Sequence, residues 1–446
     1  MSSPLKPTLY LVSSFAGAII LGTILLSLPW MHQDGLAFID ALFTATSAVC
    51  VTGLTVVDTA SAFTLPGKVV ILILIQLGGL GVMTFYSMFF LLRGRRIPIE
   101  ERLILRESFW GRRGGRLSSL ILTILFYTMV VEFLVTLLLF PFLARYYSWP
   151  SALFHALFHA VSAFCNAGFS DLPGGLEPFA RSYFFPLILM LAILAGNTGF
   201  PIVFEGVHRF RQKNRSWSLH FKLTLLIHLL LVLIGALVFL WLENEGALRE
   251  FPAPLRILQA VFLSVTPRTA GFSFLDIRYL SVPSLYFLLF LMLVGACPGS
   301  TGGGIKTTTF GVLAATVWSR LRGFSRTSVF GRTIPDSQVT KALTLVGLYL
   351  LVIFTAQFFL ISLPPHRPFL NSGSEFLAHL FEVFSALGTV GLSTGITPHL
   401  STPAKGVLIL TMFTGRVGVL SLAMLLSGLP ARSKTFYYAQ EEVLLG

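Results

Sequence analysis

A nine-residue phrase recurs four times along this chain of 446 residues and decides its fold. The phrase reads SAVCVTGLT at 47–55, SAFCNAGFS at 162–170, VTPRTAGFS at 265–273 and SALGTVGLS at 385–393. Each copy has a glycine, then Leu or Phe, then Ser or Thr; the glycines are Gly53, Gly168, Gly271 and Gly391. Successive glycines are 115, 103 and 120 residues apart, which indicates one unit copied four times.

A short apolar segment precedes each phrase and predicts a helix too short to cross a bilayer. These segments are residues 37–49, 151–164, 254–265 and 374–387. A helix of about 12 residues covers only ~18 Å of a hydrocarbon core ~30 Å thick. We therefore expect each helix to enter halfway from outside and the glycine phrase to return as irregular backbone. Hydrocarbon permits such backbone only inside protein or around a water-filled cavity.

The composition indicates a polytopic membrane protein. Apolar residues make up 54% of the chain and charged residues 11%, against about 25% charged residues in soluble domains. The mean hydropathy is +0.81. These values exclude disorder, a coiled coil and a large water-soluble enzyme. The three cysteines, Cys50, Cys165 and Cys297, lie in apolar sequence and form neither a disulfide framework nor a metal-binding spacing.

Eight stretches are long and apolar enough to predict full membrane spans. They are residues 7–33, 69–92, 117–144, 182–204, 223–242, 279–305, 342–366 and 406–431. Two of them carry one charge each, Glu132 and Arg416. The first stretch is too long for the core of a signal peptide, so we expect a retained helix.

The distribution of basic residues predicts the orientation. Connections on one side, together with both termini, hold 21 of the 32 Lys and Arg residues, and the opposite connections hold most of the acids. The basic side is cytoplasmic by the positive-inside rule, which puts both termini in the cytoplasm. The charge excess of +13 is therefore topogenic, and we expect no nucleic-acid partner.

The chemistry of the glycine turns favours a bare monovalent cation. Their side chains form neither a ring of carboxylates nor a ring of basic residues. Glycine reaches backbone angles that let successive carbonyls point inward, and carbonyl oxygens can replace the hydration shell of a cation. The short helices direct their C-terminal ends, which carry partial negative charge, toward the same cavity.

The four phrases, a broken sixth span and an arginine in the last span resemble the Trk/Ktr/HKT superfamily of potassium transporters, and most closely its KtrB-like, TrkH-related membrane subunits. The resemblance implies an all-α polytopic membrane protein. It would have four repeats of a first span, a pore helix and a second span, arranged with pseudo-fourfold symmetry around a central pore. Eight full spans would be joined by four re-entrant half-helices. The repeats would occupy residues 1–116, 117–218, 219–336 and 337–446.

The resemblance also implies a selectivity filter for K⁺ made of backbone carbonyls. Its residues would be Val51, Thr52, Gly53, Asn166, Ala167, Gly168, Thr269, Ala270, Gly271, Thr389, Val390 and Gly391. In plant relatives a serine at the first glycine position accompanies sodium selectivity. All four positions are glycine here, which favours potassium. A pore of the same architecture that passes Na⁺ as readily as K⁺ is the alternative.

Residues 295–309, GACPGSTGGGIKTTT, interrupt the sixth span. Five glycines and Pro298 within ten residues cannot hold a helix, so we expect a flexible loop. By resemblance this loop is an intramembrane gate under the filter, and its gate residues are Gly299, Gly302, Gly303, Gly304, Lys306 and Arg416. A lone arginine at this depth costs ~2.5 to 3.5 kcal/mol, so Arg416 should lie in a wet cavity or bind loop carbonyls and form an electrostatic barrier. Lys306 is either a second barrier or a donor to carbonyls.

Glycine clusters also occur in the second spans of the other units. They are Gly78, Gly79 and Gly81, then Gly196 and Gly199, then Gly415 and Gly418. We interpret them as sites of close helix packing.

The resemblance implies partners outside the chain. Besides membrane lipid, these are a second copy in a homodimer and a cytosolic nucleotide-binding regulatory ring of the KtrA or TrkA type, all at a bacterial inner membrane. Sodium would be a second, stimulating ion. The chain itself has no nucleotide site: its near-match to a P-loop, residues 299–307, is broken by Ile305 and lies at membrane depth.

Two other motifs suggest different chemistry. The sequence GLSTG at 391–395 matches a nucleophile elbow around Ser393, which makes an intramembrane serine hydrolase the second alternative. An apolar half-helix precedes the motif instead of a strand, so we do not expect an enzyme. His155 and His159 have a metal-binding spacing without a third ligand nearby, which favours packed histidines at the pore mouth.

Overall fold

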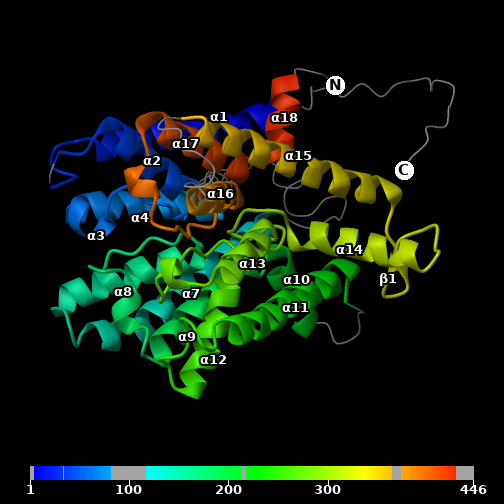
Figure 1. The fold of residues 1–446 in the computed structure, drawn as a ribbon, viewed down its shortest axis with the longest axis horizontal. Coiled ribbons are helices and arrows are strands. Elements are labelled where there is room, and N and C mark those ends of the chain that lie inside the picture. Colours follow the sequence, from blue (N-terminus) through cyan, green and yellow to red (C-terminus); the bar gives the residue numbers. More distant parts are fainter. Residues whose placement is uncertain (1–4, 34, 82–116, 212–216, 364–372, 428–446) are drawn as a thin grey trace.

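A computed structural model describes residues 5–33, 35–81, 117–211, 217–363 and 373–427 and shows an almost entirely helical protein (Figure 1). The first half of the chain forms α1 (Leu5–Leu26), α2 (Phe38–Val49), α3 (Thr59–Ala62), α4 (Leu65–Leu80), α7 (Leu117–Leu143), α8 (Trp149–Phe164), α9 (Phe184–Asn197) and α10 (Phe200–Arg211). The second half forms α11 (Leu219–Leu242), α12 (Ala253–Val265), α13 (Val282–Leu293), α14 (Thr307–Leu321), α15 (Asp336–Ile361), α16 (Gly373–Gly388), α17 (Thr402–Val417) and α18 (Val419–Ser427). A small antiparallel hairpin, β1 (Ser328–Val329) and β2 (Arg332–Thr333), joins α14 to α15.

The helices form two halves in which the beginning and the end of the chain lie together. In Figure 1, α1, α2 and α4 lie with α15 to α18 in one half, and α7 to α14 form the other. Contacts of α17 and α18 with α1, and of α17 with α2, join the first and last segments. Contacts of α4 with α8 and of α13 with α16 join the two halves. The chain therefore closes on itself around a centre.

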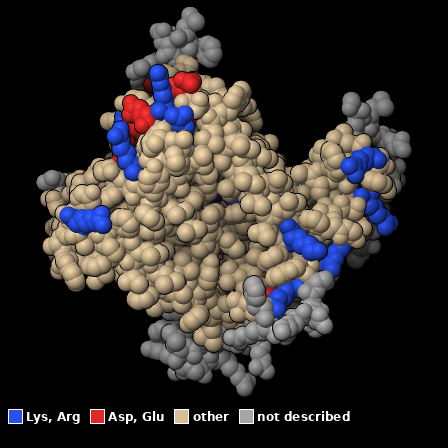
Figure 2. Space-filling model, turned by 90° about the horizontal axis from the view of Figure 1, so that it is seen from below, with Lys and Arg blue, Asp and Glu red and all other residues tan. Residues whose placement is uncertain are grey.

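Four helices are long and apolar enough to cross a membrane unbroken: α1, α7, α11 and α15. Much of their surface faces outward, and large apolar side chains such as Phe126 and Leu237 are exposed. Figure 2 shows one face of the molecule with charged side chains gathered toward its ends and a broad uncharged area between them. An apolar belt of this kind is what lipid rather than water stabilises.

The sequence predicted eight spans with only the sixth broken, and this was wrong for the second span of other units. Among the described residues, four helices are unbroken spans, or up to six if bent pairs are counted. α9 and α10 meet at 89°, and α17 and α18 meet at 102°. The reason is a glycine at each break: Gly199 and Gly418 have φ values of 34° and 98°. Gly81 ends α4 in the same way, with a φ of 82°, and residues beyond it lie outside the described part.

The four predicted half-helices are confirmed within two residues of their expected bounds. They are α2, α8, α12 and α16, with 12 to 16 residues each. Their C-terminal turns are fully buried, as Val49, Phe164 and Val265 show. The glycine phrases follow directly, so the irregular backbone lies inside protein, as expected for this depth.

The packing interpretation of the glycine clusters is confirmed for one glycine in each of three units. A Cβ atom on Gly78, Gly196 or Gly415 would collide with a backbone carbonyl oxygen at the end of a half-helix. Those oxygens belong to Val49, Phe164 and Leu387, each four residues before a phrase glycine. The glycines thus allow the second helix of a unit to touch the end of its own half-helix.

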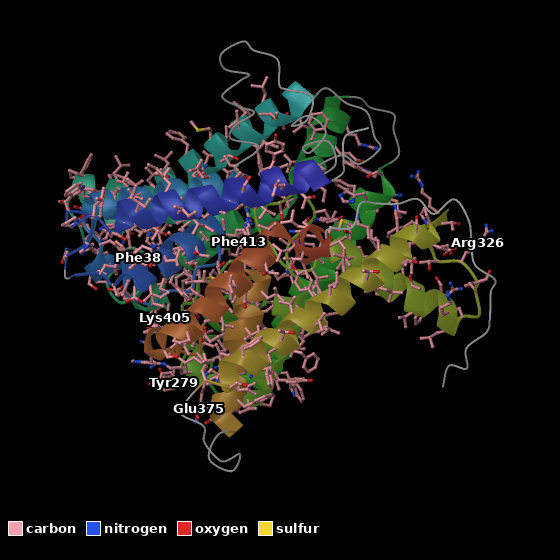
Figure 3. All side chains as sticks on the ribbon, turned by 90° about the horizontal axis from the view of Figure 1, so that it is seen from above. Phe38, Tyr279, Arg326, Glu375, Lys405 and Phe413 are labelled. Carbon is pink, nitrogen blue, oxygen red and sulfur yellow. The ribbon has the colours of Figure 1, made fainter. Side chains whose placement is uncertain are left out.

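The two ends of the molecule differ in charge. Figure 3 places Arg326 at one end and Phe38, Tyr279 and Glu375 at the opposite end. Arg320, Arg322 and Arg332 flank the same hairpin as Arg326, so this end is called the basic end below. The half-helices begin at the opposite end and run inward.

Two glycines of α17 provide a matched test of this packing. Gly415→Ala inserts a methyl group into the backbone of Leu387, which should cost about 1–3 kcal/mol of stability. Gly406→Ala lies on the same helix with no atom within 4 Å of its Cβ position and should be neutral or slightly stabilising. Thermal unfolding in detergent should show a lower midpoint for Gly415→Ala alone. Equal midpoints for the two variants would contradict the close contact.

Candidate functional site

The four glycine phrases adopt the same unusual backbone. Five non-glycine residues of the described part have a positive φ, and four of them stand two residues before a phrase glycine. They are Val51 (54°), Asn166 (59°), Thr269 (69°) and Thr389 (50°). The phrase glycines also have positive φ, between 70° and 94°. Strained backbone at four matching positions marks a functional segment, because such strain persists only where the surroundings enforce it.

The four turns contact one another in a closed ring. A Cβ atom on Gly53 would lie 2.5 Å from the carbonyl oxygen of Ala167, in the second turn. The same relation holds from Gly168 to Ala270 and from Gly271 to Val390, and Gly391 returns to the carbonyl of Thr52. Each turn thus touches the next and the last touches the first. The ring leaves no space for a side chain on any of the four phrase glycines.

Hydroxyl groups support each turn from behind. The amides of Gly53 and Gly391 donate hydrogen bonds of 3.0 Å to Ser47 and Ser385. In the other two units the hydroxyl is the donor, from Ser162 to the carbonyl of Phe169 at 2.8 Å and from Thr266 to the carbonyl of Phe272. The recurring Ser or Thr of the phrase start therefore fixes the turn.

In the second unit, the segment after the phrase glycine is held by two histidines. His155 Nδ1 and Asp171 Oδ2 are 2.7 Å apart. His159 Nδ1 donates to the carbonyl of His155, so its Nε2 accepts from the hydroxyl of Ser170, at 2.9 Å. Both rings have hydrogen-bond partners, and the described residues contain no group of His, Cys, Asp and Glu that could hold a metal. Hydrogen bonds and burial account for both histidines.

In the fourth unit, a buried carboxylate holds the equivalent segment. Glu382 is fully buried and accepts hydrogen bonds from Ser393 Oγ (2.7 Å), the Thr394 amide (3.0 Å) and Thr397 Oγ1 (2.6 Å). Ser393 is therefore bound to a carboxylate, and no histidine base appears among its hydrogen-bond partners. This geometry offers no support for a serine nucleophile.

The predicted loop interrupts the second span of the third unit between α13 and α14. It closes as a short hairpin, with the Gly295 amide bonded to the Ile305 carbonyl at 2.9 Å. It ends earlier than predicted, because α14 already begins at Thr307. The reason is that no glycine stands between Gly304 and Gly311, so the chain can form a helix as soon as the glycine cluster ends.

The loop lies against the first residue of three turns. Asn166 Nδ2 donates to Thr301 Oγ1 at 2.6 Å. Gly302 and Gly303 touch the hydroxyls of Thr269 and Thr389 so closely that a Cβ on either glycine would collide with them. The loop therefore covers the ring on the side that faces the basic end.

Arg416 and Lys306 both donate hydrogen bonds to carbonyls of the loop. Arg416 Nη1 donates to the carbonyl of Thr301 at 2.5 Å, and Nη2 donates to the carbonyl of Gly78. Lys306 Nζ donates to the carbonyls of Gly302 (2.7 Å) and Gly303 (3.2 Å). The predicted contact between Arg416 and the loop is thus present, and Lys306 does satisfy loop carbonyls.

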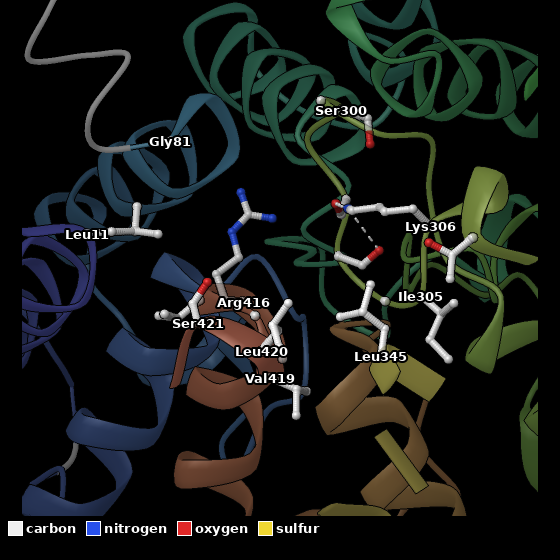
Figure 4. A pocket seen from close by; sticks show the side chains of 18 of the residues that line it. Leu11, Gly81, Ser300, Ile305, Lys306, Leu345, Arg416, Val419, Leu420 and Ser421 are labelled. Carbon is white, nitrogen blue, oxygen red and sulfur yellow. Dashed lines mark hydrogen bonds between the residues drawn. The ribbon is translucent and has the colours of Figure 1, made fainter. Parts of the chain in front are cut away.

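A cavity of about 510 Å³ lies beneath the loop. Arg416 from α17 and Lys306 from the loop lie across it from each other (Figure 4). Lys341 of α15 also lines it, whereas the described lining residues include no Asp or Glu. The described lining therefore carries basic side chains without a carboxylate beside them, which makes the cavity unfavourable for a cation.

Sequence reasoning missed several polar residues behind the ring. Asn197 and Glu382 are buried and bonded to turn or rim segments, and Arg268 is buried and bonded to His228 of α11, yet none belongs to a motif that a single sequence reveals. Arg268 gave one signal: it stands three residues before Gly271, where the other phrases have Cys50, Cys165 and Gly388.

Comparisons with known proteins agree with this architecture. Residues 9–435 match the family model TrkH, described as a cation transport protein. The chain is 38% identical to the Ktr system potassium uptake protein B of Bacillus subtilis, covering 99% of this chain and 97% of the relative. It is 36% identical to the potassium/sodium uptake protein NtpJ of Enterococcus hirae, covering 99% and 98%. The crystal structure of the potassium transporter TrkH from Vibrio parahaemolyticus shares the fold, with a TM-score of 0.72 at 22% identity, over 95% of this chain and 85% of that one.

Proposed function

The chain belongs to the TrkH family of cation transport proteins, and from this premise we propose that it is the pore-forming subunit of a potassium uptake system. The closed ring of four glycine turns carries the proposal, because each turn contacts a backbone carbonyl of the next turn and the last contacts the first. The relatives named above are potassium or potassium/sodium uptake proteins, and none is named as an enzyme.

In this proposal the turns are the selectivity filter. Carbonyl oxygens from the residues between Val51 and Gly53, and from the three matching segments, replace the hydration shell of K⁺. The positive φ at the first and third residue of each turn supports this role, since alternating backbone angles direct successive carbonyls to one side. The C-terminal ends of α2, α8, α12 and α16 add partial negative charge beside the ion.

The loop between α13 and α14 is the proposed gate, and Lys306 and Arg416 are its barrier. The contacts of Gly302 and Gly303 with Thr269 and Thr389 support a closed position in which the loop obstructs the path. The glycines, among them Gly299 and Gly304 with φ of 67°, give the loop freedom to change shape. Opening then requires Lys306 and Arg416 to release the loop carbonyls.

We propose that the basic end is cytoplasmic, with both termini on that side of a bacterial inner membrane. The four arginines around the hairpin support this orientation through the positive-inside rule. The matching half-helices and turns support four repeats with pseudo-fourfold symmetry and the unit boundaries given above.

The names of the relatives are the basis for the partners that we propose. A Ktr system protein B implies a multicomponent system. We propose that this chain forms a homodimer in the lipid membrane and binds a cytosolic nucleotide-binding ring through its basic connections. Nucleotide then binds the cytosolic regulatory partner and not this chain.

Complementation tests the function directly. The intact chain, expressed with its regulatory partner in a cell that lacks potassium uptake, should restore growth at micromolar potassium. The name of the Enterococcus hirae relative makes sodium the second candidate ion, so growth and uptake should be measured with and without sodium. Sodium uptake equal to potassium uptake would favour the alternative, a pore that passes both ions. No uptake of either ion would contradict the proposal.

The filter assignment predicts the effect of one glycine substitution. Gly53→Ser puts a side chain at a φ of 93° and 2.5 Å from the Ala167 carbonyl, so it should distort the ring and lower the preference for K⁺ over Na⁺ by roughly tenfold, about 1.4 kcal/mol. Gly395→Ser is the control, because Gly395 also has a positive φ (87°) but lies outside the ring, next to the flexible side chain of Arg278. The preference can be measured as relative permeation in proteoliposomes. An unchanged ratio in Gly53→Ser would argue against the filter.

The gate assignment predicts higher flux without Arg416. Arg416→Ala removes both the positive charge and the bonds to Thr301 and Gly78, so potassium flux should rise several-fold. Arg416→Lys keeps the charge but not the fork of donors, and it separates the two contributions. Flux near the wild-type level in Arg416→Lys would assign the barrier to charge, and flux near that of Arg416→Ala would assign it to the bonds. Unchanged flux in a folded Arg416→Ala protein would contradict the gate.

A further inference from the structure

One buried amide joins two neighbouring turns of the ring. Asn197, at the end of α9, donates from Nδ2 to Asn166 Oδ1 (3.2 Å) and to the carbonyl of Arg268 (3.0 Å). Asn166 begins the second turn, and Arg268 directly precedes the third. All three side chains are at most 1% exposed. Asn197 therefore fixes the spacing of these two turns from behind.

Arg268 continues this connection to α11. Its Nη2 donates to His228 Nδ1 at 2.8 Å and its Nη1 to the His228 carbonyl at 3.3 Å. No ion pair of Arg268 with a carboxylate occurs within the described ranges. A fully buried guanidinium without an anionic partner is costly, so its retention needs a reason other than stability.

The first half of the loop, residues 297–301, bonds to this same set of groups. The Cys297 amide donates to the carbonyl of Asn197 at 3.3 Å, and Cys297 Sγ lies 3.5 Å from His228 Nδ1. Thr301 Oγ1 accepts from Asn166 Nδ2 and lies 3.1 Å from the carbonyl of Phe164 and 3.2 Å from that of Gly196, the two acceptors for its proton. The first half is thus attached to α9, α11 and the second turn.

The second half of the loop, residues 302–304, is held differently. Its carbonyls bond to Lys306 and to the amide of Ala296, both within the same loop region. The hydroxyls of Thr269 and Thr389, which touch Gly302 and Gly303, have no hydrogen-bond partner. Among the described residues, the second half therefore contacts the ring by packing alone.

We propose that Asn197 and Arg268 are positioning residues that tie the first half of the loop to the second and third turns, so that only the second half moves when the path opens. The inference rests on the proposed function, because it divides the gate into a fixed and a moving part. It predicts that the fixed half stays in place while Lys306 releases residues 302–304.

The native thiol of Cys297 reports directly on the fixed half. Cys297 is 1% exposed in the closed position. In a chain with Cys50→Ala and Cys165→Ala, Cys297 is the only remaining cysteine. Methyl methanethiosulfonate, a small uncharged reagent, can be added to the full-length protein in proteoliposomes, and the rate of labelling gives the accessibility of Cys297.

Two changes should release the fixed half and one should not. Thr301→Val keeps the side-chain shape but loses the bonds to Asn166 and Gly196, and Arg268→Gln removes the link to His228. Both should speed labelling of Cys297 by about tenfold or more through local opening. Lys306→Gln frees the second half and should raise potassium flux while labelling stays at the wild-type rate. Thr411→Val is the matched control, since Thr411 is also buried but bonds only within α17.

Two outcomes would overturn the inference. Equal acceleration in Lys306→Gln and Thr301→Val would mean that the loop moves as one body. Wild-type labelling in both Thr301→Val and Arg268→Gln, with the proteins eluting as folded particles, would mean that these residues do not hold it. Labelling needs no transport, so a chain that fails to restore potassium uptake would contradict the proposed function without deciding this question.

Discussion

Irregular backbone at mid-membrane depth must find its hydrogen-bond and packing partners within the protein, and the rest of this structure depends on that constraint. Each glycine phrase leaves a half-helix and returns through strained backbone angles. No single turn can shield itself from lipid. The shielding comes from the neighbouring turns, because each phrase glycine rests on a carbonyl of the next unit. Four copies in one chain therefore shield one another's irregular backbone from lipid.

The same constraint explains why the second helices are short or bent. Glycines at 78, 196 and 415 let these helices approach the last carbonyls of the half-helices, which a side chain would prevent. Three residues further on, Gly81, Gly199 and Gly418 adopt positive φ and end the helix. In each of these three units, one glycine cluster thus allows the second helix to pack closely at the ring and then ends that helix just beneath it. The space opened by these breaks is the cavity that Arg416 and Lys306 line.

The sequence predicted features that follow from local length, glycine content and charge, and it missed bends and contacts that depend on tertiary packing. The half-helices could be predicted because their apolar segments are too short to span a membrane. The loop from Gly295 to Gly304 could be predicted from its glycine content. The contact of Arg416 with the loop could be predicted because a buried charge without partners is costly. The bends at Gly199 and Gly418 could not be predicted, because a glycine in an apolar run indicates packing and bending equally well. Asn197, Arg268 and Glu382 were missed because their partners lie 71, 40 and 11 residues away, across turns whose geometry no local pattern encodes.

The differences between units show where symmetry has to fail. Four equal turns suit an ion at the centre, but a loop that covers the ring can come from only one unit. In this chain the loop comes from the third unit. It is attached on the side of the second and third turns, through Asn166, Asn197 and Arg268. Arg416 bonds the loop from the opposite side, at Thr301, where the attached half meets the half that only packs. Under the proposed function, a single charge at that junction biases the loop without touching the ring, so control of the path and selection of the ion can change separately.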